Sequence, residues 1–478
     1  MRSFTLMHAN HEVLRFSYDE SSSRIASIDE ILELDHAPLF FWNDRIARIR
    51  DYDMVARMNK WIDRRAVPLS RNNLKAAFAD FGDDLPRTLA MKSYLLSLSD
   101  QYWARPAESS ATWEEVNFFD NDFAEDVGRA LAGAPAPSSP ASPHPSFNTN
   151  GFLEKTWSID SSGTRVLLKS GSGPIGQEPF NEAAATQLYS SLLAPGEYVP
   201  YDLVEYNGKV LSSCPCMVDS STELVSATDI FNSDPMNNAS MDLGGFLRAC
   251  DRLGIEGARE SLNKILTFDF ILGNVDRHGG NFGAIRVADD LSFDGPAPIF
   301  DSGLSLLCNV TDVPTDVCDL VANPFSHRLY LQLALVDDFD WFDPHPLQLA
   351  LGSLAEKLSL NANKNMDAER VEYIVNFAKS GISTVSSVAE LPPCKTRREV
   401  SERGELILNR RRDAMRALGC DPVLDPLAAV PIEKRNRIPQ FNRVSQAAFD
   451  QAKAASRAIR SSAPSVSQPS SRDRPPRL

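Results

Sequence analysis

The 478-residue chain has no long hydrophobic run. Nowhere do about 18 uncharged apolar residues stand together, and no charged start is followed by a continuous apolar segment. We therefore expect no stable membrane insertion, no secretory signal and a cytoplasmic location. With 43% hydrophobic residues the chain can bury a large core, and its length favours about two to three domains.

Cysteines are few, and no CxxC pair occurs among the seven. Their odd number and irregular spacing favour a reduced chain without a disulfide framework. Cys214 and Cys216 flank Pro215, but no second Cys/His pair stands at zinc-ligand spacing. We interpret the two as small buried residues of a strand.

Basic residues are fewer than acidic residues, with 49 Lys and Arg compared with 64 Asp and Glu. A net charge of -15 argues against nucleic-acid binding, because phosphate backbones require surplus basic residues. The stretch from Lys395 to Leu478 is the exception, with 18 basic and 9 acidic residues. It is either a solvated helix face or a contact surface for an acidic partner.

Proline and small residues mark one boundary. The segment GAPAPSSPASPHPS, from Gly133 to Ser146, can neither sustain a helix nor fill a strand, and it indicates a linker. Before it, Ser3–Ile28 alternates like a hairpin with a serine-rich turn. After it, FLEKTWSI and TRVLLK, joined by DSSG, are typical of two antiparallel strands. No internal repeat is present.

The most informative stretch is LTFDFILGNVDRHGGNFGAIRV, followed by PIFDSGLSL. It predicts a helix over 260–272, a polar loop, a strand opening at Phe282, a turn at DDLSFDG and a second strand APIFD that ends at Asp301. From about Pro324 to Leu418 the pattern is mostly helical.

The polar loop carries the residue types that phosphoryl transfer needs. Asp276 and Asn281 have the separation of the catalytic base and the metal-binding Asn of protein kinases. Asn281 and Asp301 offer hard oxygen ligands suited to Mg²⁺. His278 stands where protein kinases carry a lysine, and it can donate to the transferred group or share the proton work. A lone DRH is also typical of a surface ion pair, but the combined pattern favours catalysis.

The nucleotide-binding residues that such chemistry requires precede the loop. Lys169 closes the strand RVLLK, and Glu182 stands early in a predicted helix, thirteen residues further on. The intervening SGSGPIGQEP is either a phosphate-covering loop or a flexible turn, and the turn at 148–151 is a competing candidate. By order along the chain, backbone groups near Cys216 and Val218 are expected to meet the adenine ring.

Taken together, DRHGGN and FDSG, preceded by Lys169 and Glu182, resemble the HipA-like branch of atypical serine/threonine kinases. The D-R-H-x-x-N string is also similar to that of phosphoinositide 3- and 4-kinases. The resemblance covers roughly 147–418, and the region before it resembles the N-terminal part of bacterial HipA-like proteins. Arg277, Gly280 and a different N-terminal region depart from HipA itself, so neither a toxin role, a DNA-binding antitoxin partner nor HipA's substrate is implied.

The resemblance implies an α+β, two-lobed kinase-like fold, with Asp276 as the catalytic Asp, Asn281 and Asp301 as Mg²⁺ ligands and Lys169 as the ATP lysine. The expected segments are an N-terminal accessory domain (1–132), the linker (133–146), an N-lobe (147–225), a mostly helical C-lobe (226–445) and a basic, disordered tail (446–478).

Three functions remain open at this point. The first is an ATP- and Mg²⁺-dependent Ser/Thr protein kinase that modifies a protein substrate, with autophosphorylation as an option. The second is a phosphoinositide-type or small-molecule kinase, and the third is a pseudokinase that binds nucleotide or partners without catalysis. The acidic body argues mildly against an anionic lipid surface, whereas the basic end weakens that objection.

Overall fold

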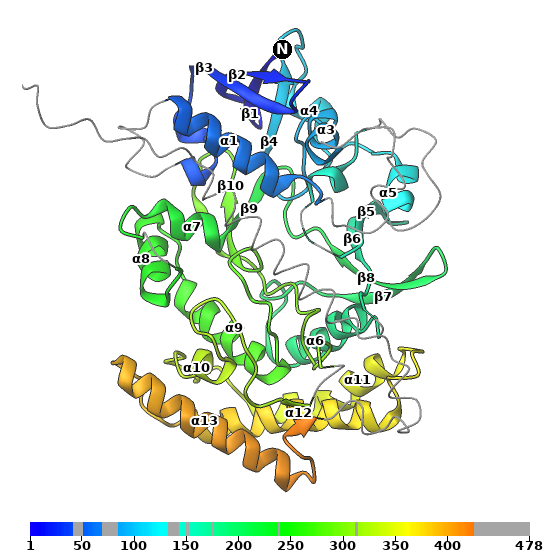
Figure 1. Ribbon diagram of the computed structural model, residues 1–478, viewed down its shortest axis with the longest axis vertical. Coiled ribbons are helices and arrows are strands. Elements are labelled where there is room, and N and C mark those ends of the chain that lie inside the picture. The colour runs from blue at the N-terminus through cyan, green and yellow to red at the C-terminus, as the bar shows by residue number, and fades with distance from the viewer. Residues whose placement is uncertain are drawn as a thin grey trace, which may run out of the picture. The chain divides into compact units, whose positions relative to one another are not determined.

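The computed structural model describes residues 1–41, 51–68, 85–131, 143–149, 151, 153–173, 175–237, 240–310 and 314–424. Met1–Val310 and Thr315–Leu424 together form one compact unit. It mixes helices with antiparallel sheets, which confirms the predicted α+β class (Figure 1). Among its described helices, none combines the length and apolarity needed to cross a bilayer.

The N-terminal sheet has the strand order β3-β2-β1-β4. Its strands are β1 (Arg2–His8), β2 (His11–Asp19), β3 (Arg24–Ile31) and β4 (Tyr102–Pro106). The serine-rich turn joins β2 to β3, as the alternating pattern predicted, and a further turn joins β1 to β2. Apolar residues of one face pack against α1 (Asp51–Arg65) and α3 (Leu85–Lys92) in a core of their own.

A second antiparallel sheet has the order β5-β6-β8-β7. Its strands are β5 (Lys155–Ile159), β6 (Arg165–Lys169), β7 (Asp202–Tyr206) and β8 (Lys209–Pro215). The hairpin β5–β6 has the predicted turn, and Lys155 pairs with Lys169 in register. The following helix α6 (Glu178–Leu192) is buried along most of its length, so it holds its early residues firmly beside this sheet.

A third sheet and three helices frame the predicted catalytic loop. The strands β9 (Thr222–Ser226), β10 (Gly283–Val287) and β11 (Phe293–Pro296) have the order β11-β10-β9. The helices are α7 (Ala227–Ser233), α8 (Leu243–Leu253) and α9 (Ala258–Leu272).

One strand prediction here is wrong. The partner of β10 is Phe293–Pro296 rather than APIFD. Pro296 lies opposite Ala284, and the register shifts by a bulge at Ile285/Arg286. The chain that follows makes only an isolated bridge, from Ile299 to Tyr198, so Asp301 follows an extended segment and not a hairpin strand.

The predicted helical region contains α10 (Leu329–Leu333), α11 (Pro344–Ser359), α12 (Ala368–Val388) and α13 (Arg397–Ala417). These pack with α6 and α9 around the largest apolar core. In Figure 1 α12 and α13 lie side by side. The short strands β12 (Thr315–Asp316) and β13 (Val423–Leu424) pair with each other.

The segment boundaries inferred from composition stay predictions. Most of the proposed linker (133–142) and the whole proposed tail (446–478) lie outside the described residues. His144 and Ser146, at the linker's end, are fully buried. His144 caps a 3-10 helix over Pro145–Asn148, which contains Ser146.

Candidate active site

The loop between α9 and β10 is anchored by one arginine. Arg277 donates from Nε and Nη2 to the two carboxylate oxygens of Asp269, at 3.0 and 2.9 Å. Both side chains are almost fully buried. The remaining Nη1 donates to the carbonyl oxygens of Asn281, at 2.7 Å, and of Phe300. A single guanidinium therefore ties α9 to both segments that carry the predicted metal ligands.

Within the loop the backbone turns tightly around Asp276. The Asn281 Nδ2 donates to the Asp276 carbonyl oxygen at 2.9 Å, which leaves the amide oxygen as the atom for a cation. The backbone amide of Gly280 donates to Nδ1 of His278 at 3.0 Å. A neutral His278 ring accepting at Nδ1 carries its proton on Nε2, so this exposed side chain can donate from there.

Glycine is required at one position of this loop. A Cβ on Gly279 would lie 2.4 Å from Oγ1 of Thr228, and the Gly279 carbonyl accepts from the Thr228 amide at 2.9 Å. The loop therefore packs against the start of α7, and the string DRHGGN contains a glycine for reasons of space.

The predicted nucleotide residues meet at a second cluster. Lys169 Nζ donates to Oε1 of Glu182 at 3.0 Å and to Oδ1 of Asp301 at 3.1 Å. Side-chain exposure is 8% for Lys169, 3% for Glu182 and 32% for Asp301. Burial alone would lower the pKa of Lys169, but the two carboxylates outweigh it and hold the pKa well above its ordinary value. Lys169 is thus a buried, fixed cation, and Asp301 is the most exposed of the three side chains.

Asp301 has a strained backbone. Its φ of 58° lies in the left-handed region, which costs a non-glycine residue about 1–3 kcal/mol and persists only when neighbours enforce it. The Asp301 amide donates to Oη of Tyr201 at 3.4 Å, and the next amide, of Ser302, donates to Oε2 of Glu182 at 2.9 Å. Burial opposes ionisation of Asp301, but Lys169 and then Lys155 outweigh it and lower its pKa.

Asp276 and Asp301 lie close enough to repel each other. Burial first, and then the charge of Asp301, raise the pKa of Asp276, while His278 acts in the opposite sense. The carboxylates of Asp276 and Asp301 and the amide of Asn281 offer only oxygen atoms to a cation. That set fits Mg²⁺, which prefers such hard ligands.

Two predictions about nucleotide contacts stay predictions. The side chains of Cys216 and Val218 pack in an apolar cluster with Trp103 and Trp113. The Cys216 amide donates to the Arg165 carbonyl oxygen at 2.8 Å, so any contact with an adenine would use other backbone groups.

The two candidate phosphate loops differ in their surroundings. In SGSGPIGQEP, the Ser172 amide donates to a carboxylate oxygen of Glu178 at 3.1 Å, which places negative charge at this loop. At the competing turn, Gly151 has a φ of 114° and lies against the Lys155 side chain. Residues 150, 152 and 174 lie outside the described part.

Sequence reasoning missed four contributors to the site: the anchoring pair Arg277 and Asp269, the ring of Tyr201, and Lys155. Asp269 had a signal, since it is the one charge in the apolar run LTFDFIL, where an acid is rarely buried unpaired. Tyr201, whose Oη lies 3.3 Å from Lys169 Nζ, had none, because it stands just before β7, far from Lys169 in the sequence.

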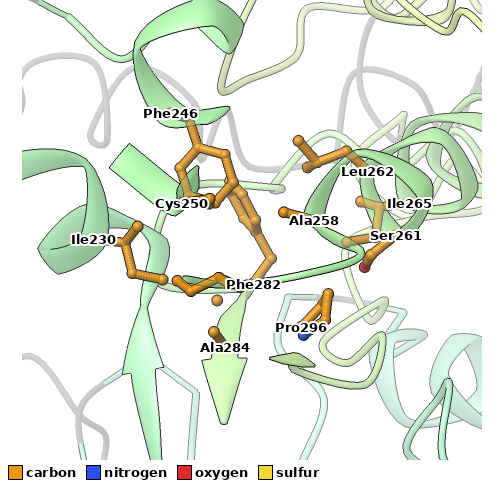
Figure 2. Close-up of a pocket in the computed structure, with 12 residues that line it drawn as sticks. Ile230, Phe246, Cys250, Ala258, Ser261, Leu262, Ile265, Phe282, Ala284 and Pro296 are labelled. Carbon is orange, nitrogen blue, oxygen red and sulfur yellow. The ribbon is translucent and has the colours of Figure 1, made fainter. Parts of the chain in front are cut away.

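A small apolar pocket lies apart from these clusters. It is lined from α7, α8, α9 and β10 by side chains including Ile230, Phe246, Leu262 and Phe282 (Figure 2). None of the predicted site residues lines it, and without a charged side chain its walls do not suit a phosphate.

No family model matches this chain, and no curated protein matches it. Among solved structures, it is similar to a Helicobacter pylori proinflammatory kinase, CtkA, with 18% identity and a TM-score of 0.32 over 55% of this chain and 94% of that one. It is also similar to Shewanella oneidensis MR-1 HipA, from a toxin–antitoxin complex with HipB and operator DNA, with 13% identity and a TM-score of 0.41 over 87% and 98%. At such TM-scores the roles of residues depend on the geometry described above.

Proposed function

We propose that this chain is an ATP- and Mg²⁺-dependent phosphotransferase, and specifically a protein serine/threonine kinase. The observation that carries the proposal is the placement of Lys169 Nζ between Glu182, at 3.0 Å, and Asp301, at 3.1 Å. A buried cation beside an acidic, metal-competent side chain is what the phosphates of a nucleotide require.

Each predicted residue has a role in this proposal. Lys169 neutralises phosphate oxygens, and Glu182 keeps its ammonium in place. Asp276 orients the acceptor hydroxyl and takes its proton, for which its raised pKa suits it. His278 donates to the transferred group. Asn281 and Asp301 hold Mg²⁺, which when bound neutralises charge on the phosphates.

Arg277 is a positioning residue in this proposal. It touches no substrate, but it fixes the carbonyls of Asn281 and Phe300 relative to α9. The distance between the metal ligands thereby depends on a buried ion pair, and catalysis loses rate steeply when reacting groups are misplaced.

The acceptor in this proposal is a protein hydroxyl, and the chain itself is one candidate substrate through autophosphorylation. The net charge of -15 disfavours anionic lipid surfaces and nucleic acid as partners. The basic stretch from Lys395 is a proposed contact for an acidic partner, and α13 is its described part.

The test is transfer of label from γ-labelled ATP with Mg²⁺ by the purified full-length chain, first alone with a general protein substrate and then with phosphoinositide vesicles. Label on serine or threonine, located by mass spectrometry, supports the proposal. Label in lipid alone contradicts the protein-kinase assignment. Binding of ATP, seen as a rise in the melting temperature, without any transfer would favour the pseudokinase reading instead.

A matched pair of variants makes the test specific. Asp301→Asn removes the charge beside Lys169, whereas Asp294→Asn makes the same change at an exposed position of β11. We expect transfer to fall at least about 100-fold in the first variant and to be unchanged in the second. Equal activity in the two would contradict the site.

A further inference from the structure

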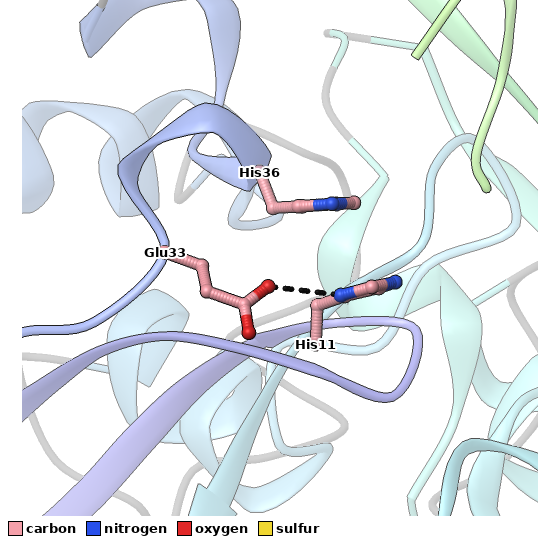
Figure 3. Close-up of side chains that lie close together, drawn as sticks. All are labelled: His11, Glu33 and His36. Atoms are coloured by element: carbon pink, nitrogen blue, oxygen red, sulfur yellow. Dashed lines mark hydrogen bonds and ion pairs between the residues drawn. The ribbon is translucent and has the colours of Figure 1, made fainter. Parts of the chain in front are cut away.

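Histidines gather on the N-terminal sheet, away from the Lys169 cluster. His11 lies on β2, and Glu33 and His36 lie just after β3 (Figure 3). Nδ1 of His11 is 2.9 Å from Oε2 of Glu33. The rings of His11 and His36 are stacked, with centroids 3.7 Å apart and planes at 10°. One ligand atom from each of the three residues lies within 4.8 Å of the others.

A third histidine, His8, contacts this group through His36. His8 is fully buried, with Nε2 3.2 Å from Oε2 of Glu223 and Nδ1 3.0 Å from Nδ1 of His36. Glu223 forms an ion pair with buried Arg286, so it is a carboxylate that only accepts.

These contacts determine the tautomers when the rings are neutral. His8 donates from Nε2 to Glu223, and its Nδ1 then accepts from the Nδ1–H of His36. The lone pair of His36 is consequently on Nε2, free for a cation. A carboxylate that orients a histidine through hydrogen bonds is the usual outer support of a metal ligand.

We propose that His11, Glu33 and His36 bind a divalent transition-metal ion of the zinc type, with His8 as the outer partner of His36. Two imidazoles and one carboxylate are a ligand set that zinc accepts, with a fourth position left for water. Neutral imidazole is the form that binds metals, and close stacking disfavours two charged rings.

Little movement is needed to close the site. Ligand atoms on tetrahedral zinc stand about 3.3 Å apart, given bonds near 2.0–2.1 Å. The side chains of His11 and Glu33 are 41% and 52% exposed, so they can rotate by the remaining ångström or so without disturbing the core.

The site would join two sheets. His8 belongs to β1, Glu223 to β9 and Arg286 to β10, and β10 follows directly after the catalytic loop. A metal ion that holds His36 against His8 would therefore stabilise the contact between the N-terminal sheet and the sheet beside the candidate active site. The inference does not depend on the proposed kinase function.

The test is calorimetric titration of the metal-free full-length chain with Zn²⁺, followed by zinc X-ray absorption spectroscopy. We expect one ion bound through nitrogen and oxygen at about 2.0–2.1 Å, with no sulfur at about 2.3 Å, and a raised melting temperature. No binding at micromolar zinc, or a sulfur ligand, would overturn the proposal, because the chain also has seven cysteines.

Variants locate the ion. His11→Asn and Glu33→Gln should each weaken binding at least about tenfold, whereas His345→Asn, which removes an exposed imidazole elsewhere, should not. Glu33 is exposed, so Glu33→Gln should keep the metal-free melting temperature even if His11→Asn perturbs the fold. Unchanged zinc affinity in Glu33→Gln and His36→Asn would refute the assignment.

Discussion

Two buried ion pairs lie beside the same loop, and they differ in how accessible they are. In the Arg277–Asp269 pair both partners are nearly inaccessible. The guanidinium donates four hydrogen bonds to carboxylate and carbonyl oxygens, and Asn274 donates a further one to Asp269. In the Lys169–Asp301 pair the carboxylate is 32% exposed and its backbone is strained. A closed pair fixes geometry, whereas an open and strained pair can exchange its partner for a ligand.

The largest effect is expected from removing Asp276, the proposed base, which interacts with Asp301 of the more exposed pair. Asp276→Asn should lower turnover about 10²–10⁴-fold, because the hydroxyl proton loses its acceptor. The rise in melting temperature on adding ATP with Mg²⁺ should persist, since Lys169 and Asp301 are untouched. Phosphate transfer and thermal shift, measured on the same preparation, check both halves. Full turnover in this variant would remove Asp276 from the reaction.

Breaking the closed pair should act on stability instead. Arg277→Met leaves the carboxylate of Asp269 buried without its partner, and we expect a loss of about 3–5 kcal/mol in the free energy of unfolding. The control is Arg259→Met on α9, the helix that carries Asp269. The exposed ion pair of Arg259 with Asp337 should contribute no more than about 1 kcal/mol. Urea unfolding compares the two, and similar losses would show that burial of the Arg277 pair is immaterial.

A smaller effect is expected from changing Tyr201, whose hydroxyl lies near Lys169 and Asp301. Tyr201→Phe removes the hydroxyl near Lys169 Nζ and the Asp301 amide but keeps the ring. We expect about 0.5–1.5 kcal/mol of lost stability and a modest fall in turnover. Tyr206→Phe, on the outer strand β7, is the matched control and should do neither. Equal effects of the two changes would deny Tyr201 a role in holding Asp301.

The smallest effect concerns pH. Because burial and Asp301 raise the folded-state pKa of Asp276, the folded protein binds this proton more tightly than the unfolded chain does. Ionised Asp276 therefore lowers the free energy of unfolding of the wild type above that pKa, and this loss is absent below the ordinary carboxyl pKa of about 3.9. Asp276→Asn should melt slightly higher than wild type near pH 7, with the difference vanishing at acid pH. A lower melting temperature at pH 7 would contradict the raised pKa.

Local sequence patterns predicted much of the architecture. The β5–β6 hairpin, the helix into the catalytic loop and the C-terminal helices all have strong apolar periodicity with turn residues between them. The strand after β10 was predicted at APIFD because that run is apolar, whereas the chain pairs through Phe293–Pro296, whose Asp, Gly and Pro are depleted in strands. The glycine-rich stretch was ambiguous because glycine permits both a phosphate loop and a turn.

By itself, the sequence determined the α+β class and the identity of the residues that meet around Lys169, because their chemistry and order are legible in one dimension. Only the tertiary structure decided that Arg277 is a buried anchor, that Tyr201 and Lys155 join the site, and that a group of three histidines meets Glu223 of another sheet. Such contacts join residues up to 215 positions apart. They arise from packing between elements, which no local pattern encodes.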